Sequence, residues 1–108
     1  MTTLGVVNRE QKGGEMTKFT VRVELHDEES GDYPKLHKQM EIRGFVRTIE
    51  VDGTLYQLPD ASYVYNGEKT KEQVYDKARA AADAIGRDAG IVVTKSDGGR
   101  FVGGLHKA

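Results

Sequence analysis

Hydrophobic and polar residues first alternate strictly between Phe19 and Leu25. Every second residue of this segment is apolar, and a threonine or a charged residue stands between each pair. A period of two predicts a half-buried β-strand. The polar run at 27–32 interrupts the alternation, so we expect a loop there.

A change of period marks the first helix. Tyr33, Leu36 and Met40 are three and four residues apart, so they share one helical face. Pro34 suits the first turn of a helix, and Gly44 suits the left-handed residue that follows a helix end. The sequence therefore predicts a helix that begins near Pro34 and ends before Gly44.

Strand patterns return after this helix. Residues 45–51 are rich in apolar and β-branched residues, and Asp52-Gly53 follows them directly. An Asp-Gly pair between two β-rich segments is a strong hairpin signal, so we expect 54–58 to be the returning strand. Residues 61–65 resume strand character after Pro59.

The second helix has a marked beginning. Thr70 and Gln73 have the spacing of a capping box. Apolar residues then recur at intervals of four, three and four, at Val74, Ala78, Ala81 and Ile85. Gly86 or Gly90 is expected to end this helix, and Ile91–Thr94 to form a last short strand.

This order of elements predicts an α+β domain of the ferredoxin-like βαββαβ type. Two helices are expected on one face of a four-stranded antiparallel sheet with the strand order 4-1-3-2. The residues expected to form one contiguous core are Phe19, Val21, Val23, Leu25, Leu36, Met40, Ile49, Val74, Ala78, Ile85 and Val92.

We expect the folded domain to span residues 16–96. Residues 1–15 have no sustained period, and their end at 12–15 reads like a ribosome-binding site translated in frame before Met16. They are expected to be either a leader upstream of a natural start at Met16 or a disordered extension. Residues 97–108 hold four of the 13 glycines and are expected to form a flexible tail.

Composition narrows the classes of function. The chain has 108 residues, so one domain is expected. Its net charge is -1, so we do not expect it to bind nucleic acid such as duplex DNA through its overall charge alone. Cysteine is absent, which excludes disulfides, thiol nucleophiles and cysteine-ligated metals. Apolar runs are too short for a membrane helix or a secretory signal, so a cytoplasmic protein with no membrane partner is expected.

Three groups of side chains offer chemistry, each with a plainer alternative. The carboxylates after the first strand could hold Mg²⁺, or they could only form a solvated loop and cap the helix that follows. They are Asp27, Glu28, Glu29 and Asp32. Basic side chains could contact phosphate or only face solvent, at Lys35, His37, Lys38, Arg43 and Arg47. Aromatic strand residues could stack RNA bases or belong to the core, at Tyr56, Tyr63 and Tyr65.

Diagnostic catalytic motifs are absent from the sequence. The three histidines lie in different predicted elements without metal-ligand spacing, and no phosphate loop or dinucleotide fingerprint is present. We therefore expect no resident metal site and no cofactor.

A spaced pattern over residues 18–94 carries a family resemblance. Its elements are an acidic residue after the first strand, two apolar helix positions, an aromatic strand opening, and a hairpin followed by a strand aromatic, at Asp27, Leu36, Met40, Phe45, Gly53, Gln57, Leu58 and Tyr63. In this pattern the chain resembles the GhoS-type antitoxin family, small ferredoxin-like domains similar to the CRISPR-associated ferredoxin-fold nucleases.

The resemblance implies an endoribonuclease, with little or no dependence on metal, that cleaves the single-stranded message of a membrane toxin. Its catalytic candidates are Asp27, which would position a metal or water, and His37, which would act as general acid and base. Phosphate would be bound by Lys35, Lys38, Arg43 and Arg47. Asp27 matches an acidic residue at a dimer seam in the CRISPR-associated relatives, so a homodimer is compatible with this reading.

The alternative is a non-enzymatic regulatory or protein-interaction module that acts through its sheet face or sheet edge. The slight net acidity and the absence of a catalytic motif favour this alternative. Convergence of His37, Lys38 and Arg47 beside Asp27 would favour RNA instead, whereas a dispersed set of cations beside an apolar sheet face would favour a protein partner.

Overall fold

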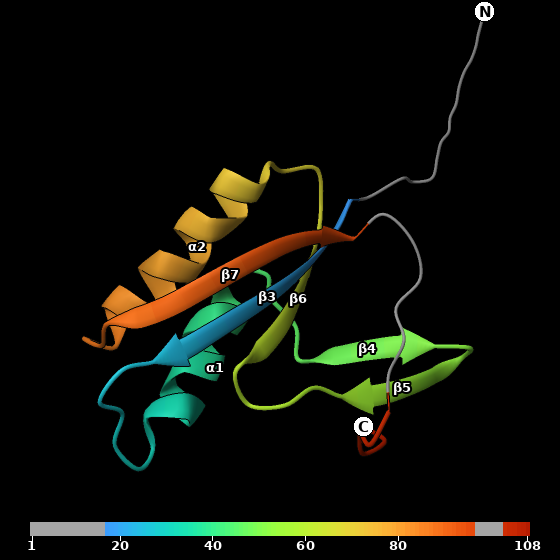
Figure 1. The fold of residues 1–108 in the computed structure, drawn as a ribbon, viewed down its shortest axis with the longest axis horizontal. Coiled ribbons are helices and arrows are strands. Elements are labelled where there is room, and N and C mark those ends of the chain that lie inside the picture. The colour runs from blue at the N-terminus through green and yellow to red at the C-terminus, as the bar shows by residue number, and fades with distance from the viewer. Residues whose placement is uncertain (1–16, 97–102) are drawn as a thin grey trace, which may run out of the picture.

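The computed structural model describes residues 17–96 and 103–108. Along the chain, the elements are β3 (Lys18–Leu25), α1 (Asp32–Ile42), β4 (Thr48–Val51), β5 (Thr54–Gln57), β6 (Ser62–Asn66), α2 (Lys71–Ala84) and β7 (Ala89–Ser96). The predicted alternation of strands and helices is present, and the chain is an α+β protein (Figure 1).

Three strands form the main sheet. β3 lies in its centre and pairs antiparallel with β6 on one side and with β7 on the other. The segment 45–51 was expected to belong to a four-stranded sheet. Only Val46 pairs with the main sheet, by exchanging backbone hydrogen bonds of 2.9 and 2.8 Å with Val64.

The residues after Val46 leave the main sheet because they form their backbone hydrogen bonds with β5 and the residue that follows it. The carbonyl oxygen of Arg47 accepts a hydrogen bond from the backbone N–H of Leu58 (2.7 Å), and β4 then pairs with β5 as a separate two-stranded sheet. The expected four-stranded sheet is thus a three-stranded sheet with a hairpin projecting from one edge (Figure 1).

The predicted hairpin itself is confirmed. Asp52 and Gly53 have φ angles of 51° and 80°, the left-handed pair that a two-residue turn between twisted strands requires. β5 also has a neighbour on its other side. The N–H of Gln57 donates to the carbonyl of His106 (2.8 Å), and the N–H of Ala108 donates to the carbonyl of Leu55 (2.9 Å).

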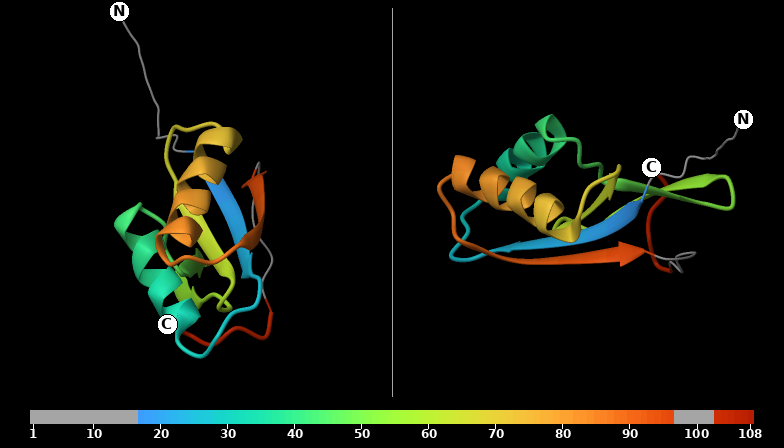
Figure 2. Two further views of the ribbon diagram at one scale, coloured as in Figure 1. Left: turned by 90° about the vertical axis from the view of Figure 1, so that its left-hand side faces the viewer. Right: turned by 90° about the horizontal axis from the view of Figure 1, so that it is seen from above.

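Both helices cover the same face of the main sheet (Figure 2). The core beneath them consists of Phe19, Val21, Val23, Leu25, Leu36, Met40, Phe45, Tyr63, Tyr65, Val74, Ala78, Ala81, Ala82 and Ala89. Of the other predicted core residues, Ile85 packs half-buried against this cluster, and Ile49 is buried outside it.

The prediction that Val92 belongs to the core is wrong. Val92 is 60% exposed because it pairs with Arg22, whose side chain points to the face of the sheet away from the helices. Ile91 and Val93 pair instead with Val23 and Val21, so they point toward the core. Three consecutive β-branched residues fit either register equally well, and only the pairing with β3 selects between them.

The predicted signals at helix ends are largely confirmed. The hydroxyl of Thr70 accepts from the N–H of Gln73 (3.0 Å), and the Gln73 side chain accepts from the N–H of Thr70 (2.9 Å). Gly44 follows α1 with a φ of 94°, and a Cβ there would lie 3.3 Å from the ring of Tyr65. Glycine is therefore required both by the backbone angle and by the packing.

The start of α1 differs from expectation. Its N-cap residue is Gly31 and has no side-chain cap, while Asp32 lies in the first turn and is buried. The Asp32 carboxylate accepts hydrogen bonds from the N–H of Glu29 and from Nε of Arg87, each 2.7 Å long. The bond from Glu29 holds the pKa of Asp32 below its ordinary value against the effect of burial. Asp32 thus links the start of α1 to the segment after α2.

Two expectations concern the ends of the chain. Residues 1–15 and 97–102 lie outside the described residues, so the expectations for these two segments stay predictions. Residues 103–108, the rest of the expected tail, are described, and the two hydrogen bonds given above join them to β5. Neither helix in the described part of the chain has the length and apolar character that crossing a membrane requires.

Candidate functional site

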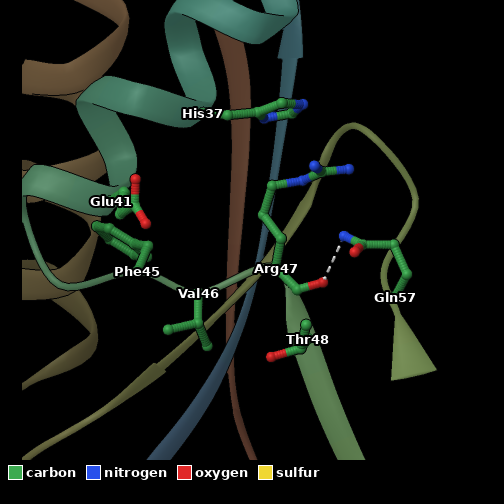
Figure 3. A pocket seen from close by; sticks show the side chains of 7 residues that line it. All are labelled: His37, Glu41, Phe45, Val46, Arg47, Thr48 and Gln57. Carbon is green, nitrogen blue, oxygen red and sulfur yellow. Dashed lines mark hydrogen bonds between the residues drawn. The ribbon is translucent and has the colours of Figure 1, made fainter. Parts of the chain in front are cut away.

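A pocket of about 390 Å³ opens where the chain leaves the sheet edge. Its walls come from α1, from the segment that joins α1 to β4, and from the end of β5. The lining residues are His37, Glu41, Phe45, Val46, Arg47, Thr48 and Gln57 (Figure 3). The pocket exists because Val46 bridges to β6 while β4 turns away from it, which leaves a gap beside α1.

His37 is the titratable ring in this pocket. Its side chain is 18% exposed, and its Nδ1 lies 2.6 Å from the hydroxyl of Tyr63. Its Nε2 lies 3.7 Å from a carboxylate oxygen of Asp60. Burial, followed by the nearby charge of Arg47, lowers the pKa of His37 below its ordinary value. The ring is therefore neutral at pH 7, with one nitrogen that donates and one that accepts.

Tyr63 fixes how that ring is held. It is fully buried, and its ring meets the His37 ring edge-on at a centroid distance of 5.6 Å. Burial raises the pKa of Tyr63 far above its ordinary value, so its hydroxyl keeps its proton at all physiological pH values. The hydroxyl can donate to Nδ1 or accept from it, and this choice sets the tautomer of His37.

Arg47 supplies the positive charge. Its guanidinium donates to a carboxylate oxygen of Asp60 (3.1 Å) and to the carbonyl of Leu58 (3.3 Å). The side-chain amide of Gln57 donates to the Arg47 carbonyl (3.0 Å) and so holds the backbone in place. Nε of Arg47 is buried and has no hydrogen-bond partner in the described part of the chain. Figure 3 shows the guanidinium and the His37 ring extending to the same side of the pocket.

Only part of the predicted site comes together. His37 and Arg47, one from α1 and the other ahead of β4, line one pocket. Arg43 lies at the end of α1, where its guanidinium donates to the side chain and the carbonyl of Gln39 (2.8 and 3.0 Å). Lys35 and Lys38 are exposed on α1, outside the pocket lining.

Asp27 lies elsewhere. It is exposed in the loop after β3, with a positive φ of 53°. Its carboxylate makes no hydrogen bond or ion pair with the residues of 17–96 and 103–108, and it does not line the pocket of His37. In those same ranges, no three His, Asp or Glu side chains are grouped so as to hold a metal ion.

Sequence reasoning missed two members of the site and the role of a third. Asp60 carried no signal, since a single aspartate after Pro59 is typical of any loop. Glu41 could have been found, because it lies one helical turn after His37. Tyr63 was expected either to stack bases on an exposed sheet face or to belong to the core, and it faces the helices and belongs to the core. Its hydroxyl, rather than its ring face, contributes to the site.

The electrostatics of the pocket are mixed. Arg47 brings one positive charge, the carboxylate of Asp60 lies 3.1 Å from its guanidinium, and Glu41 lines the same pocket. Asp60 is 74% exposed, so its ion pair with Arg47 is open to water and easily exchanged for another anion. The arrangement can therefore bind a ligand with both an anionic group and hydrogen-bond donors, next to a neutral imidazole that can take up a proton.

No protein-family model and no curated protein matches this chain. The function is therefore argued from the residues of the pocket.

Proposed function

We propose that this protein binds single-stranded RNA in the cytoplasm and cleaves it at the pocket of His37 and Arg47, as its resemblance to the GhoS-type antitoxin family implies. The observation that carries the proposal is that the imidazole of His37 and the guanidinium of Arg47 line the same pocket, although the two residues are ten positions apart in sequence. Arg47 binds a phosphate, and His37 moves the proton. The volume of about 390 Å³ suits one nucleotide unit.

The reaction proposed needs no metal. The 2′-oxygen of the nucleotide attacks the adjacent phosphorus, the bond from phosphorus to the 5′-oxygen breaks, and a 2′,3′-cyclic phosphate and a free 5′-hydroxyl result. His37 takes the proton from the 2′-hydroxyl, and a solvent water molecule gives a proton to the 5′-oxygen that leaves. The guanidinium of Arg47 stabilises the negative charge that grows on the phosphate oxygens.

Tyr63 decides whether His37 begins as a base. When Nδ1–H donates to the Tyr63 oxygen, Nε2 carries the lone pair that the 2′-hydroxyl proton needs. In the other tautomer, Tyr63 donates to Nδ1, and Nε2–H donates to a phosphate oxygen. The lowered pKa of His37 keeps the ring in the neutral form that a base requires at pH 7.

Glu41 gives the pocket a preference for a nucleotide over bare phosphate. A carboxylate repels phosphate but accepts hydrogen bonds from the amino and imino groups on the edge of a base. Thr48 and Gln57 add further hydrogen-bonding groups to the same lining. Asp60 is the competitor, because phosphate must replace it beside Arg47.

The fold supports this proposal through its strand order. With the segment around Val46 counted as a short fourth strand, the order across the sheet is β7-β3-β6 followed by that segment. This is the 4-1-3-2 order of the ferredoxin-like arrangement. We therefore infer a ferredoxin-like domain whose fourth strand is cut short, and the pocket lies where it ends.

The experiment is incubation with labelled single-stranded RNA at low salt, with and without Mg²⁺. We expect binding in a gel-shift assay and cleavage products that end in a cyclic phosphate, in both conditions. The variant His37→Gln should retain most of the binding and lower the cleavage rate by about 10²–10⁴-fold, which is the usual contribution of a general acid or base.

A matched pair of variants tests the role of Arg47. Arg47→Gln should weaken binding and reduce the log–log salt slope by about 0.7, the value for one phosphate contact with a single strand. Arg22→Gln removes the same charge from an exposed side chain on the open sheet face, where it pairs with Glu24, and should leave binding unchanged. If the folded wild-type protein neither shifts nor cuts RNA at low salt, the proposal is wrong and the interaction-module alternative remains.

A further inference from the structure

The outer edge of β7 carries backbone groups that point away from the sheet. His26 donates its N–H to the carbonyl of Asp88 (2.9 Å), so this pair is hydrogen-bonded across β3 and β7. Bonded and non-bonded pairs alternate in an antiparallel ladder. It follows that Gly90, Val92 and Thr94 bond to β3, and that the residues between them direct N–H and C=O outward.

The first outward residue is already satisfied within the chain. The N–H of Ala89 donates to the side chain of Asp88 (2.9 Å), and the carbonyl of Ala89 accepts from the guanidinium of Arg79 (3.0 Å). The remaining outward residues are Ile91, Val93 and Lys95. In the described part of the chain, β7 pairs only with β3, so these three residues have no strand partner there.

We propose that a second copy of this chain pairs with β7 through this edge, antiparallel and with its two-fold axis at Val93. The cap on Ala89 selects this register. The three residues with unpaired outward groups are centred on Val93, so a two-fold axis at Val93 pairs them with the same three residues of the second copy. Val93 then lies opposite Val93 of the second copy, and Ile91 lies opposite its Lys95. Both backbone groups of each of these residues are then satisfied, and no like charges are opposed.

A groove beside the edge leaves room for the added strand. It has a volume of about 300 Å³ and lies between α2 and β7, lined by Lys71, Glu72, Tyr75, Asp76 and Val93. In the proposed register, the Val93 side chain of the second copy points to the helix side and enters this groove. Tyr75, which is 37% exposed, becomes covered.

The composition of the edge suits pairing with a copy of itself. β7 spans eight residues without proline, and Lys95 is its only charged residue. Proteins that keep an edge strand from pairing usually place proline, several charges or a bulge on it. Each groove contains a lysine as well as two carboxylates, so two copies do not oppose surfaces of a single sign. This inference does not depend on the pocket of His37.

Sedimentation equilibrium of the full chain tests the proposal. The mass should rise from 11.9 kDa toward twice that value between low micromolar and near-millimolar concentration. Val93→Pro removes an outward N–H from each copy and no bond to β3, so the dissociation constant should rise roughly tenfold or more. Glu50→Gln changes an exposed residue on the β4–β5 hairpin, away from the β7 edge, and should leave the dissociation constant unchanged. A wild-type chain that stays monomeric overturns the proposal, as does a Val93→Pro dimer of unchanged strength.

A cross-link reads the register without relying on a proline variant. The chain has no cysteine, so each introduced thiol is the only one present. Hydrogen-bonded residues across an antiparallel pair have Cα atoms about 5.5 Å apart, within the range for a disulfide. Val93→Cys should therefore form a disulfide dimer on mild oxidation much faster than Glu50→Cys, an exposed site on the β4–β5 hairpin. Equal rates for the two variants would overturn the register. A chain that pairs at this edge only when an extended peptide is added would overturn the second copy as the occupant, because it would show that a foreign strand occupies the edge.

Discussion

At the β6 edge of the main sheet, the outward N–H and C=O of Val64 are both bonded to Val46, whereas at the β7 edge the outward groups of Val93 meet no described residue. Each edge also carries an aspartate between an arginine and a histidine. Asp60 lies near Arg47 and His37 beside β6, and Asp88 lies near Arg79 and His26 at the start of β7.

The difference lies in what covers the edge and in how far the histidine is buried. The covering segment beside β6 bonds at one residue and then diverges, so a pocket forms next to a His37 side chain that is 18% exposed. The β7 edge runs straight for eight residues, and the side chain of His26 beside it is 55% exposed. The irregular edge thus contains a pocket, and the regular edge presents outward backbone groups along a straight strand.

The largest expected effect is on the anchor of the segment that covers β6. Phe45 is 1% exposed and packs against the rings of Tyr63 and Tyr65. Phe45→Ala should lower the free energy of unfolding by about 3–5 kcal/mol, the usual cost of an aromatic-to-alanine cavity. Val92→Ala on the open face beside the other edge should cost only about 0.5 kcal/mol or less. Urea denaturation of both variants measures this, and similar losses would contradict the difference between the two edges.

A second pair of variants removes one outward backbone N–H from each edge and compares the losses in stability. Val64→Pro removes the N–H that donates to the Val46 carbonyl (2.8 Å), and the loss of a bonded buried group should cost about 1–3 kcal/mol. Val93→Pro removes an N–H that faces outward and should cost clearly less in the monomer at low concentration. Thermal unfolding of dilute samples gives the comparison. Equal destabilisation would show that the β7 edge is covered in solution.

Local features of the fold were predictable because their causes are local. The capping box at Thr70, the turn at Asp52-Gly53 and the helix end at Gly44 each depend on a few neighbouring residues, and the structure contains all three. The burial of Val92 was predicted wrongly because a β-branched run has no period of its own. The four-stranded sheet is not confirmed, since the competition between β6 and β5 for residues 46–48 is decided in three dimensions.

The site was less predictable than the fold. His37 and Arg47 were selected from one basic group, and the fold brings these two together while it leaves Lys35, Lys38 and Arg43 outside the pocket. Asp60 carries no sequence signal, because its contacts reach back to residues 13 and 23 positions earlier. Such long-range pairings arise only after the strands have taken their register.

A third prediction concerns the two bridging aspartates. Asp60→Asn removes the competitor for Arg47 and should strengthen RNA binding several-fold, in keeping with the roughly 0.2–1 kcal/mol of an exposed ion pair. Asp88→Asn makes the same change beside Arg79 and should leave RNA binding unaltered. Fluorescence anisotropy at constant salt measures both variants. Tighter binding by both would indicate a general charge effect and remove the special role of the β6 edge.

The smallest expected effect is a pH dependence of stability at the β6 edge. Burial lowers the pKa of His37 in the folded protein, whereas the unfolded chain keeps a value near 6.5. Below about pH 6.5, the unfolded state therefore binds more protons at this ring, and the stability falls as the pH drops toward the folded pKa. His37→Gln lacks this dependence, so the wild type should lose stability relative to it between about pH 7.5 and about pH 5 in urea unfolding. The variant His26→Gln is the control for the exposed histidine beside β7. The contradicting result is a difference in the free energy of unfolding between wild type and His37→Gln that stays constant on acidification or grows in favour of the wild type. In that case His37 does not have the lowered pKa on which its proposed role as a base depends.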